Sequence, residues 1–234
     1  MKFRTLLIMR IFYRCFVFVV FIIPMVATGQ NLQLHYDFGK ADNGDSRADR
    51  NYFTATMELF KPDSLGSTFL FIDVDFDKEN DGASMSYFEI SRKFTLHKSG
   101  LGIHVEYDDG TPDYINRAWL VGVCYPINIK GFVLSTSVLY RAAKYANHPD
   151  VKFTTVWFQP LLHGRVLFSG FIDLWSQDDF SGVGKDLVIL SEPQLWFVCN
   201  NHFSVGTEVE ISRNFFTFDN EFEFMPTAAI KWDF

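Results

Sequence analysis

The segment FSVGTEVEI, residues 203–211, places an apolar residue or threonine at every odd position and a polar residue or glycine at every even position. Because successive side chains of a β-strand point to opposite faces, this alternation predicts a strand with one apolar face and one charged face. The same period of two recurs along the chain, for example in residues 32–38 and 101–107. The chain is therefore predicted to be all-β.

Twelve segments with this alternation follow one another after residue 30. We expect strands at residues 31–38, 50–60, 67–77, 83–94, 101–108, 115–125, 131–141, 151–160, 165–176, 186–198, 203–212 and 220–234. Most are longer than the ~5–6 residues of a strand in a globular protein. They match the ~9–11 residues with which a tilted strand crosses a bilayer. We therefore predict one domain, residues 30–234, that folds as an antiparallel transmembrane β-barrel of about 12 strands.

The expected connections alternate in character. Every second one is short, as at residues 61–66 and 126–130, whereas the others are mostly longer and acidic, as at residues 39–49 and 177–185. Their Pro, Gly, Asn and Asp residues favour turns. Short turns at one rim and longer loops at the other are typical of outer-membrane barrels, and an even number of strands places both ends of the barrel at the short-turn rim.

The first 29 residues differ from the rest of the chain. Four basic residues accompany an apolar block at residues 15–26, and small residues at 27–29 precede Gln30. The block is shorter than the ~20 residues of a membrane-spanning helix. This layout predicts a secretory signal peptide at residues 1–29, with a short membrane anchor as the alternative.

Export changes the charge and limits the partners. The 234-residue chain has a formal net charge of −7, and loss of the four basic leader residues takes it to −11. This charge disfavours nucleic acid as a partner, because nucleic acid binds basic patches. The remaining Cys124 and Cys199 fall at strand ends that we expect to be too far apart for a disulfide. The chain has no CxxC or HExxH spacing, so no metal or cofactor is expected.

The chain ends with AAIKWDF, residues 228–234. Its even positions are apolar, whereas Lys231 and Asp233 point to the other face. Outer-membrane barrels resemble this segment, because their last strand alternates aromatic residues, ends in Phe and is read by the assembly machinery. We therefore expect the lipid bilayer and this machinery as partners, and a place in the bacterial outer membrane.

If the apolar face meets lipid, the polar face of each strand lines the interior. The candidate pore-lining residues are His35, Asp37, Phe71, Asp73, Asp75, His104, Glu106, Arg141, Arg165, Phe171, Asp173, Trp175, Glu192, Gln194, Trp196, Glu208 and Glu210. The wider inward set adds Gln33, Glu58, Glu89, Lys152, Phe158, Glu221 and Glu223. Charged groups would set the electrostatics of a channel, and rings would stack on flat solutes. The parity of the second, fourth, sixth and eighth strands stays open, because a one-residue shift reverses every side chain.

Three alternatives accompany the channel. In a closed structural or interaction barrel, the inward charges would only pair with one another. A soluble sandwich or soluble barrel would bury its apolar faces in a core. A lipid-modifying enzyme would need a serine beside a histidine. No GxSxG motif exists and no serine-rich group accompanies the histidines, so we predict no enzymatic activity.

The mature chain resembles the nucleoside-specific outer-membrane channel (Tsx-like) family. The resemblance rests on about twelve strands in roughly 200 residues, the opening NLQLHYDFGKAD at 31–42, a wall rich in Phe and Trp, and the final AAIKWDF. The chain also resembles uncharacterised exported proteins of Bacteroides-type bacteria that are grouped near that family. The resemblance implies a monomeric barrel with a narrow pore, through which nucleosides diffuse passively past aromatic and ionisable side chains. Parity alone makes Phe71, Phe171, Trp175 and Trp196 the candidate stacking residues.

Overall fold

The computed structural model describes residues 29–39, 51–77, 82–96, 98–112, 117–179, 181–215 and 220–234. The predicted signal peptide, apart from Gly29, lies outside these residues. The strands are β1 (Gln30–Asp37), β2 (Phe53–Asp63), β3 (Gly66–Asp77), β4 (Gly82–Thr95), β5 (Gly102–Thr111), β6 (Ala118–Ile129), β7 (Phe132–Ala143), β8 (Asp150–Leu161), β9 (Val166–Asp178), β10 (Lys185–Ser191), β11 (Gln194–Val198), β12 (Phe203–Arg213) and β13 (Phe222–Asp233). No helix in the described part of the chain is long and apolar enough to cross a membrane.

The sheet closes on itself. Neighbouring strands pair antiparallel in sequence order from β1 to β9, and β13 pairs with both β12 and β1. β10 and β11 pair with the same two strands, β9 and β12. Ser191 pairs with Ile172, and the register is unchanged where pairing resumes at Gln194. β10 and β11 are therefore one interrupted strand, and the predicted barrel of twelve antiparallel strands is confirmed.

The interruption between β10 and β11 lies at Glu192 and Pro193. Proline has no N–H to donate to a β-ladder, which explains why the pairing stops there. Gly170 of β9 lies opposite, with a φ of +146°, and a Cβ on it would lie 2.9 Å from the Cα of Pro193. Only glycine permits this close approach of the two backbones.

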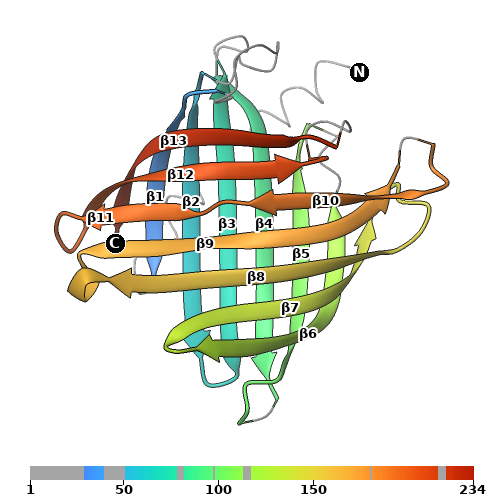
Figure 1. Ribbon diagram of the computed structural model, residues 1–234, viewed down its shortest axis with the longest axis horizontal. Helices are drawn as coiled ribbons and strands as arrows, with labels where there is room; N and C mark the ends of the chain where they lie inside the picture. Colours follow the sequence, from blue (N-terminus) through green and yellow to red (C-terminus); the bar gives the residue numbers. More distant parts are fainter. Residues whose placement is uncertain are drawn as a thin grey trace, which may run out of the picture.

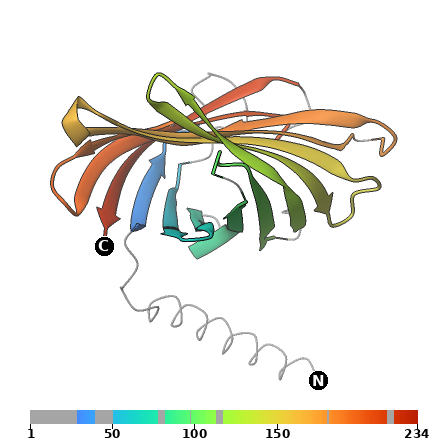
Figure 2. The same ribbon diagram turned by 90° about the horizontal axis from the view of Figure 1, so that it is seen from below.

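The two walls of the barrel cross one another. In Figure 1, β1 to β4 run from top to bottom at the back, and β7 to β13 run across in front of them. Figure 2, turned by 90°, shows the two walls facing each other and joined at both sides. Side chains from strands far apart in the sequence therefore face one another across the interior.

The predicted alternation of connection length holds around most of the ring but not from β3 to β6, where four residues separate β3 from β4 and six separate both β4 from β5 and β5 from β6. Short turns join β2 to β3, β4 to β5, β6 to β7, β8 to β9 and β11 to β12. Between β6 and β7 only Lys130 and Gly131 remain, with φ of 55° and 92°. Positive φ at both residues is typical of the type I′ hairpin turn. β6 therefore runs on to Ile129, and most of the short turn predicted at 126–130 belongs to the strand instead.

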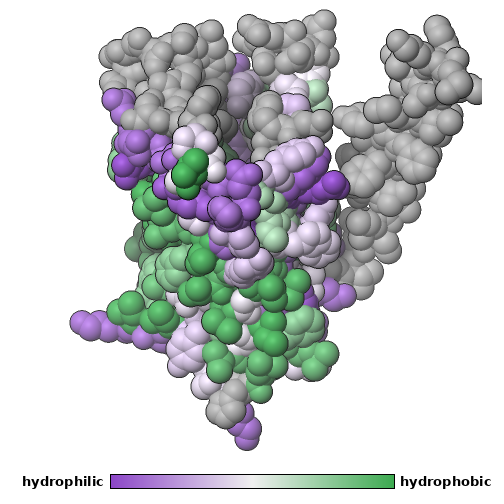
Figure 3. Space-filling model, turned by 90° about the vertical axis from the view of Figure 1, so that its right-hand side faces the viewer, coloured by the Kyte–Doolittle hydropathy of each residue, from purple (hydrophilic) through white to green (hydrophobic). Residues whose placement is uncertain are grey.

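The burial pattern is the reverse of that in a soluble protein. In β1, Leu32 and Leu34 are 45% and 39% exposed, whereas Gln33 and His35 between them are 1% and 2% exposed. Large exposed apolar residues recur on the outer face of the other strands, and Figure 3 shows them gathered in a broad zone, with hydrophilic residues toward one end. This pattern disagrees with the soluble alternatives, because their apolar faces would be buried.

Candidate functional site: the interior of the barrel

The register determines which face of each strand points inward. Inward residues are the odd ones in β1, β3, β4, β7, β9 and β13, and the even ones in β2, β5, β6, β8, β10, β11 and β12. A register shift opposite Asp75 and Phe76, where Ser84 is an extra residue, limits this rule at the start of β4. The pattern also covers the four strands whose parity the sequence left open. The candidate pore-lining residues within strands all lie on this face.

One group of interior residues surrounds Lys152 of β8. Its Nζ lies 2.8 Å from Oε1 of Glu106 in β5 and 2.9 Å from Oδ2 of Asp173 in β9. His104 Nε2 lies 3.2 Å from the other oxygen of Glu106, and His104 Nδ1 lies 2.9 Å from the hydroxyl of Ser137 in β7. All five side chains are buried. We call them the lysine cluster.

A second group surrounds Trp196 of β11, whose side chain is fully buried. The indole Nε1 donates a hydrogen bond to Oε1 of Gln194 (2.9 Å), and Nε2 of Gln194 donates to Oε2 of Glu208 (2.6 Å). The His35 ring meets the indole edge-on at 5.9 Å between centroids, and Nζ of Lys231 lies 4.4 Å from the indole centroid. We call these five residues the tryptophan cluster.

A third group gathers carboxylates from β3 and β12 and two threonines from β2. Thr56 donates a hydrogen bond to Asp73, and Thr54 donates one of 2.7 Å to Asp75. The carboxylate of Asp73 interacts electrostatically with Glu208 and with Glu210 of β12, so acids from opposite walls approach one another. Phe71 stands beside them, 6.0 Å from the Tyr87 ring.

The remaining candidates lie toward the two ends. Arg141 is 3.6 Å from Asp150 and lies 6.0 Å from the Trp175 ring centroid. Asp37 accepts a hydrogen bond from the Gly39 N–H at 2.7 Å. Arg165 lies exposed just before β9, Phe171 faces inward within β9, and Glu192 lies in the interruption before β11.

Several inward residues were missed by the sequence analysis. Asp108 was placed at the end of the strand predicted at 101–108 and left out of the inward set, because DDG is a turn signal, yet β5 continues to Thr111. Lys93 was not singled out, although its Nζ bonds to Ser135 Oγ at 2.8 Å beside a cavity of about 390 Å³ at the short-turn end. The sequence did place Lys231 opposite the aromatic face but gave it no role. Each of these two lysines lies on the inward face together with acidic residues, and this pattern in the sequence could have predicted an interior ion pair.

Much of the interior is filled by side chains. Leu120, Leu139 and Val188 face inward from three different strands and are at most 1% exposed. These residues and Trp196 leave little room for solvent at their level. The observed interior is therefore narrow, as expected for a barrel between the filled eight-stranded size and the wide channels of ~16 strands.

Ser137, His104 and Glu106 form an unexpected series, in which His104 is hydrogen-bonded to Ser137 and lies in ion-pair contact with Glu106. A serine, a histidine and an acid in this order resemble the arrangement that activates a nucleophile. Ser137 and His104 are each 2% exposed, however, and face the interior. This hydroxyl is therefore not accessible from the outer face of the barrel.

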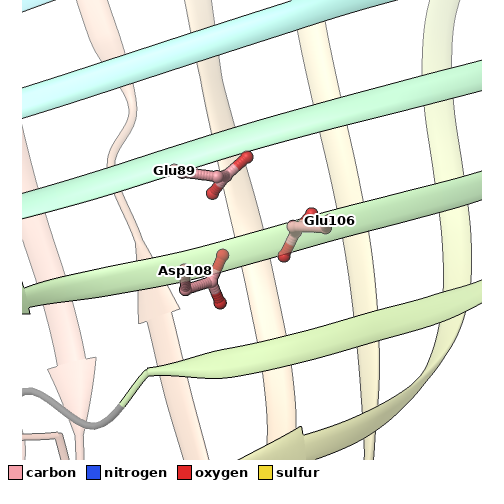
Figure 4. A group of neighbouring side chains, drawn as sticks. All are labelled: Glu89, Glu106 and Asp108. Carbon is pink, nitrogen blue, oxygen red and sulfur yellow. The ribbon is translucent and has the colours of Figure 1, made fainter.

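Three carboxylates could hold a metal ion. Glu89 of β4 and Glu106 and Asp108 of β5 each offer one oxygen, and these oxygens lie within 4.8 Å of one another. Figure 4 shows the three side chains directed toward a common space.

Comparison with known proteins gives one family and several barrels. A family model described as "Domain of unknown function (DUF5020)" matches residues 29–234. No curated protein matches the sequence. Similar solved structures include the KdgM porin (10% identity, TM-score 0.48, 88% of this chain and 98% of that chain) and Omp33 of Acinetobacter baumannii (9%, 0.43, 90% and 100%). Similarity at this level carries no argument about function.

Proposed function

The chain belongs to the family described as a domain of unknown function (DUF5020), and we propose that it is an integral protein of the bacterial outer membrane that forms a narrow channel for passive diffusion of small solutes. The observation that carries the proposal is the reversed burial pattern of the wall. Apolar side chains cover the outside, and ionisable side chains fill the inside.

The outer face supports a place in lipid. In β6, for example, Trp119 and Val121 are 61% and 50% exposed. Burial of a large apolar side chain is worth about 1.5–3 kcal/mol, so a water-exposed wall of such residues would be strongly unfavourable. A closed barrel also leaves no strand edge without partners, which a bilayer requires.

The inner face supports a hydrated channel rather than a dry plug. The inward acids of β2, β3, β5, β9 and β12 outnumber the inward bases, among which are Lys93, Arg141, Lys152 and Lys231. Carboxylates without a compensating charge are very costly in a dry interior. Water or mobile cations in the lumen would remove that cost, and an acidic lining favours cations and neutral solutes over anions.

A second candidate is a closed structural or interaction barrel. The full burial of Leu120, Leu139 and Val188 favours it, because a wide water path would expose such side chains. An enzymatic role is not proposed, since Ser137 is inaccessible from lipid.

Nucleoside selectivity and the mode of assembly extend the proposal. Nucleosides are proposed as one solute class only because of the resemblance to Tsx-like channels. Two candidate stacking rings already have neighbours of their own: Arg141 lies over Trp175, and Lys231 lies over Trp196. We further propose a monomer, inserted by the outer-membrane assembly machinery through the last strand, whose Trp232 and Phe234 are exposed.

Conductance in planar bilayers tests the channel. The purified protein in detergent is added to a bilayer in KCl, and a salt gradient then gives the ion selectivity. We expect small, cation-selective steps that graded neutral solutes, including nucleosides, partly block. Absence of current at every voltage would remove the channel and leave the closed barrel. A protein that stays monodisperse without detergent would remove the membrane proposal itself.

A further inference from the structure

The three carboxylates of Figure 4 are brought together by the pairing of β4 with β5. Glu89 lies directly opposite Asp108, and Glu106 precedes Asp108 by two residues on the same inner face. Their positions are therefore fixed by two neighbouring strands of a closed wall rather than by a loop. Such a rigid support suits a binding site.

Asp108 carries an oxygen that has no partner among the described residues. Its side chain is only 7% exposed, and Oδ1 receives no hydrogen bond. Figure 4 shows the carboxylate of Asp108 directed toward Glu89 and Glu106. A buried carboxylate oxygen without a donor is costly, so this oxygen calls for a ligand that supplies positive charge.

The charges around the three carboxylates do not balance. Lys152 contacts Glu106 and also Asp173, so one ammonium serves two acids and leaves Glu89 and Asp108 at this site. His104 contacts Glu106 but adds charge only when protonated. Arg141 is directed to Asp150, at 3.6 Å. A bound divalent cation would restore the balance.

The spacing of the oxygens fits calcium. Ca²⁺ binds oxygen ligands at ~2.3–2.6 Å, so oxygens on opposite sides of the ion lie up to about 5 Å apart. The three carboxylate oxygens, all within 4.8 Å of one another, meet this condition without movement of the strands. Mg²⁺ demands shorter bonds in a nearly ideal octahedron, which three carboxylates on a flat wall do not provide as readily.

We propose that Glu89, Glu106 and Asp108 bind one divalent cation of the Ca²⁺ type inside the barrel. Glu106 then lies between the cation on one side and Lys152 and His104 on the other. Water molecules in the lumen complete the coordination. The cation links β4 and β5 to the lysine cluster and neutralises Glu89 and Asp108, which Lys152 does not contact.

Calorimetric titration tests this site without any measurement of transport. The protein folded in detergent micelles is titrated with CaCl₂ at constant ionic strength, and with MgCl₂ and NaCl for comparison. We expect one saturable Ca²⁺ site and weaker binding of Mg²⁺. Glu89→Gln and Asp108→Asn should each weaken Ca²⁺ binding by about tenfold or more, as when metal sites lose supporting groups. The matched control is Glu58→Gln, an inward acid bonded to Asn31 at 2.8 Å, which should bind as the original protein does.

Two results would overturn the site. The first is the absence of saturable Ca²⁺ binding by the unaltered protein, which needs no variant. The second is equal Ca²⁺ affinity in Glu89→Gln, Asp108→Asn and Glu58→Gln, which would mean that ions bind elsewhere. Heat-modifiable migration on gels verifies that each variant is folded, and Glu89→Gln alone is decisive if Asp108→Asn does not fold. Because Ca²⁺ binding is measured in micelles, a negative binding result does not bear on the proposed channel. Likewise, absence of current in the bilayer does not bear on the proposed Ca²⁺ site.

Lys152 supplies a test in the opposite direction. Its ammonium repels a cation held by Glu106, so Lys152→Met should tighten Ca²⁺ binding by about tenfold or more, the change expected when about 1.4 kcal/mol of repulsion is removed. Weaker binding in this variant would contradict the placement of the cation beside Glu106.

Discussion

The lysine cluster and the tryptophan cluster occupy the same interior but are held together by different forces. Around Lys152, one ammonium compensates two buried carboxylates, 2.8 and 2.9 Å away. Around Trp196, an indole and an amide pass hydrogen bonds on to Glu208. The first arrangement is stable only while its charges are matched, whereas the second depends mainly on packing of the indole and on hydrogen bonds from neutral donors, with Lys231 over the ring as its one cation. The two sides of the barrel should therefore respond differently to salt, cations and substitution.

Lys152→Met should have the largest effect on stability. Loss of the ammonium leaves Glu106 and Asp173 buried without their partner, and breaking a buried ion pair in this way costs about 3–5 kcal/mol. Urea unfolding in lipid vesicles, followed by tryptophan fluorescence, measures the change. The variant that also carries Glu106→Gln should recover part of the loss. Unchanged stability in Lys152→Met would show that the pair contributes nothing.

Trp196→Phe should have an intermediate effect. The smaller ring leaves a cavity and removes the donor to Gln194, with a combined cost of about 2 kcal/mol from lost packing and one hydrogen bond. The same unfolding assay, repeated at low and high salt, separates the two clusters. The cost at Trp196 should stay constant with salt, and the cost at Lys152 should not. An equal salt dependence would break the distinction between the clusters.

Ser137→Ala should have the smallest effect. The hydroxyl makes one hydrogen bond with His104, so its loss should cost about 1 kcal/mol. Hydrolysis of phospholipid and lipid A acyl chains, measured by release of fatty acid, should be absent in the original protein and in the variant alike. Activity that disappears with Ser137→Ala would instead identify a catalytic serine and refute the prediction that the protein is not an enzyme.

The sequence was sufficient for the wall but not for the contacts inside it. Alternation of side chains determines which residues of a strand share a face, and His35, Glu106 and Trp175 each lie on the inward face of their strand. Which of them meet depends on strand tilt and register around the whole ring. Lys152 and Glu106 are 46 residues apart and come from strands that are not neighbours. A local sequence pattern cannot predict a contact between residues that are so far apart in the chain.

Turn signals in the sequence also failed where pairing with neighbouring strands overrode them. Asp108 and the residues after it read as a turn, but pairing with β4 keeps residues 108–111 in β5, and Asp108 also pairs with Ala118 of β6. The hairpin at Lys130 is tighter than its sequence suggests, because strands of matched length on either side leave only two residues for the turn. In both places pairing with neighbouring strands extended a strand beyond its own signals.

Pro193 has a consequence for how the wall tolerates a defect. A missing ladder hydrogen bond in a lipid-facing sheet would ordinarily leave a backbone N–H without an acceptor in the hydrocarbon core. Here the residue at the defect has no amide hydrogen, and its neighbours stay tied, since the Glu192 N–H bonds to Phe171 O at 3.2 Å and the Val209 N–H bonds to Pro193 O at 3.1 Å. The wall is therefore less stiff at this point, although the strand register is kept and no backbone N–H is left without an acceptor. Among the amides of β9 to β12, those next to Pro193 should exchange with deuterium fastest.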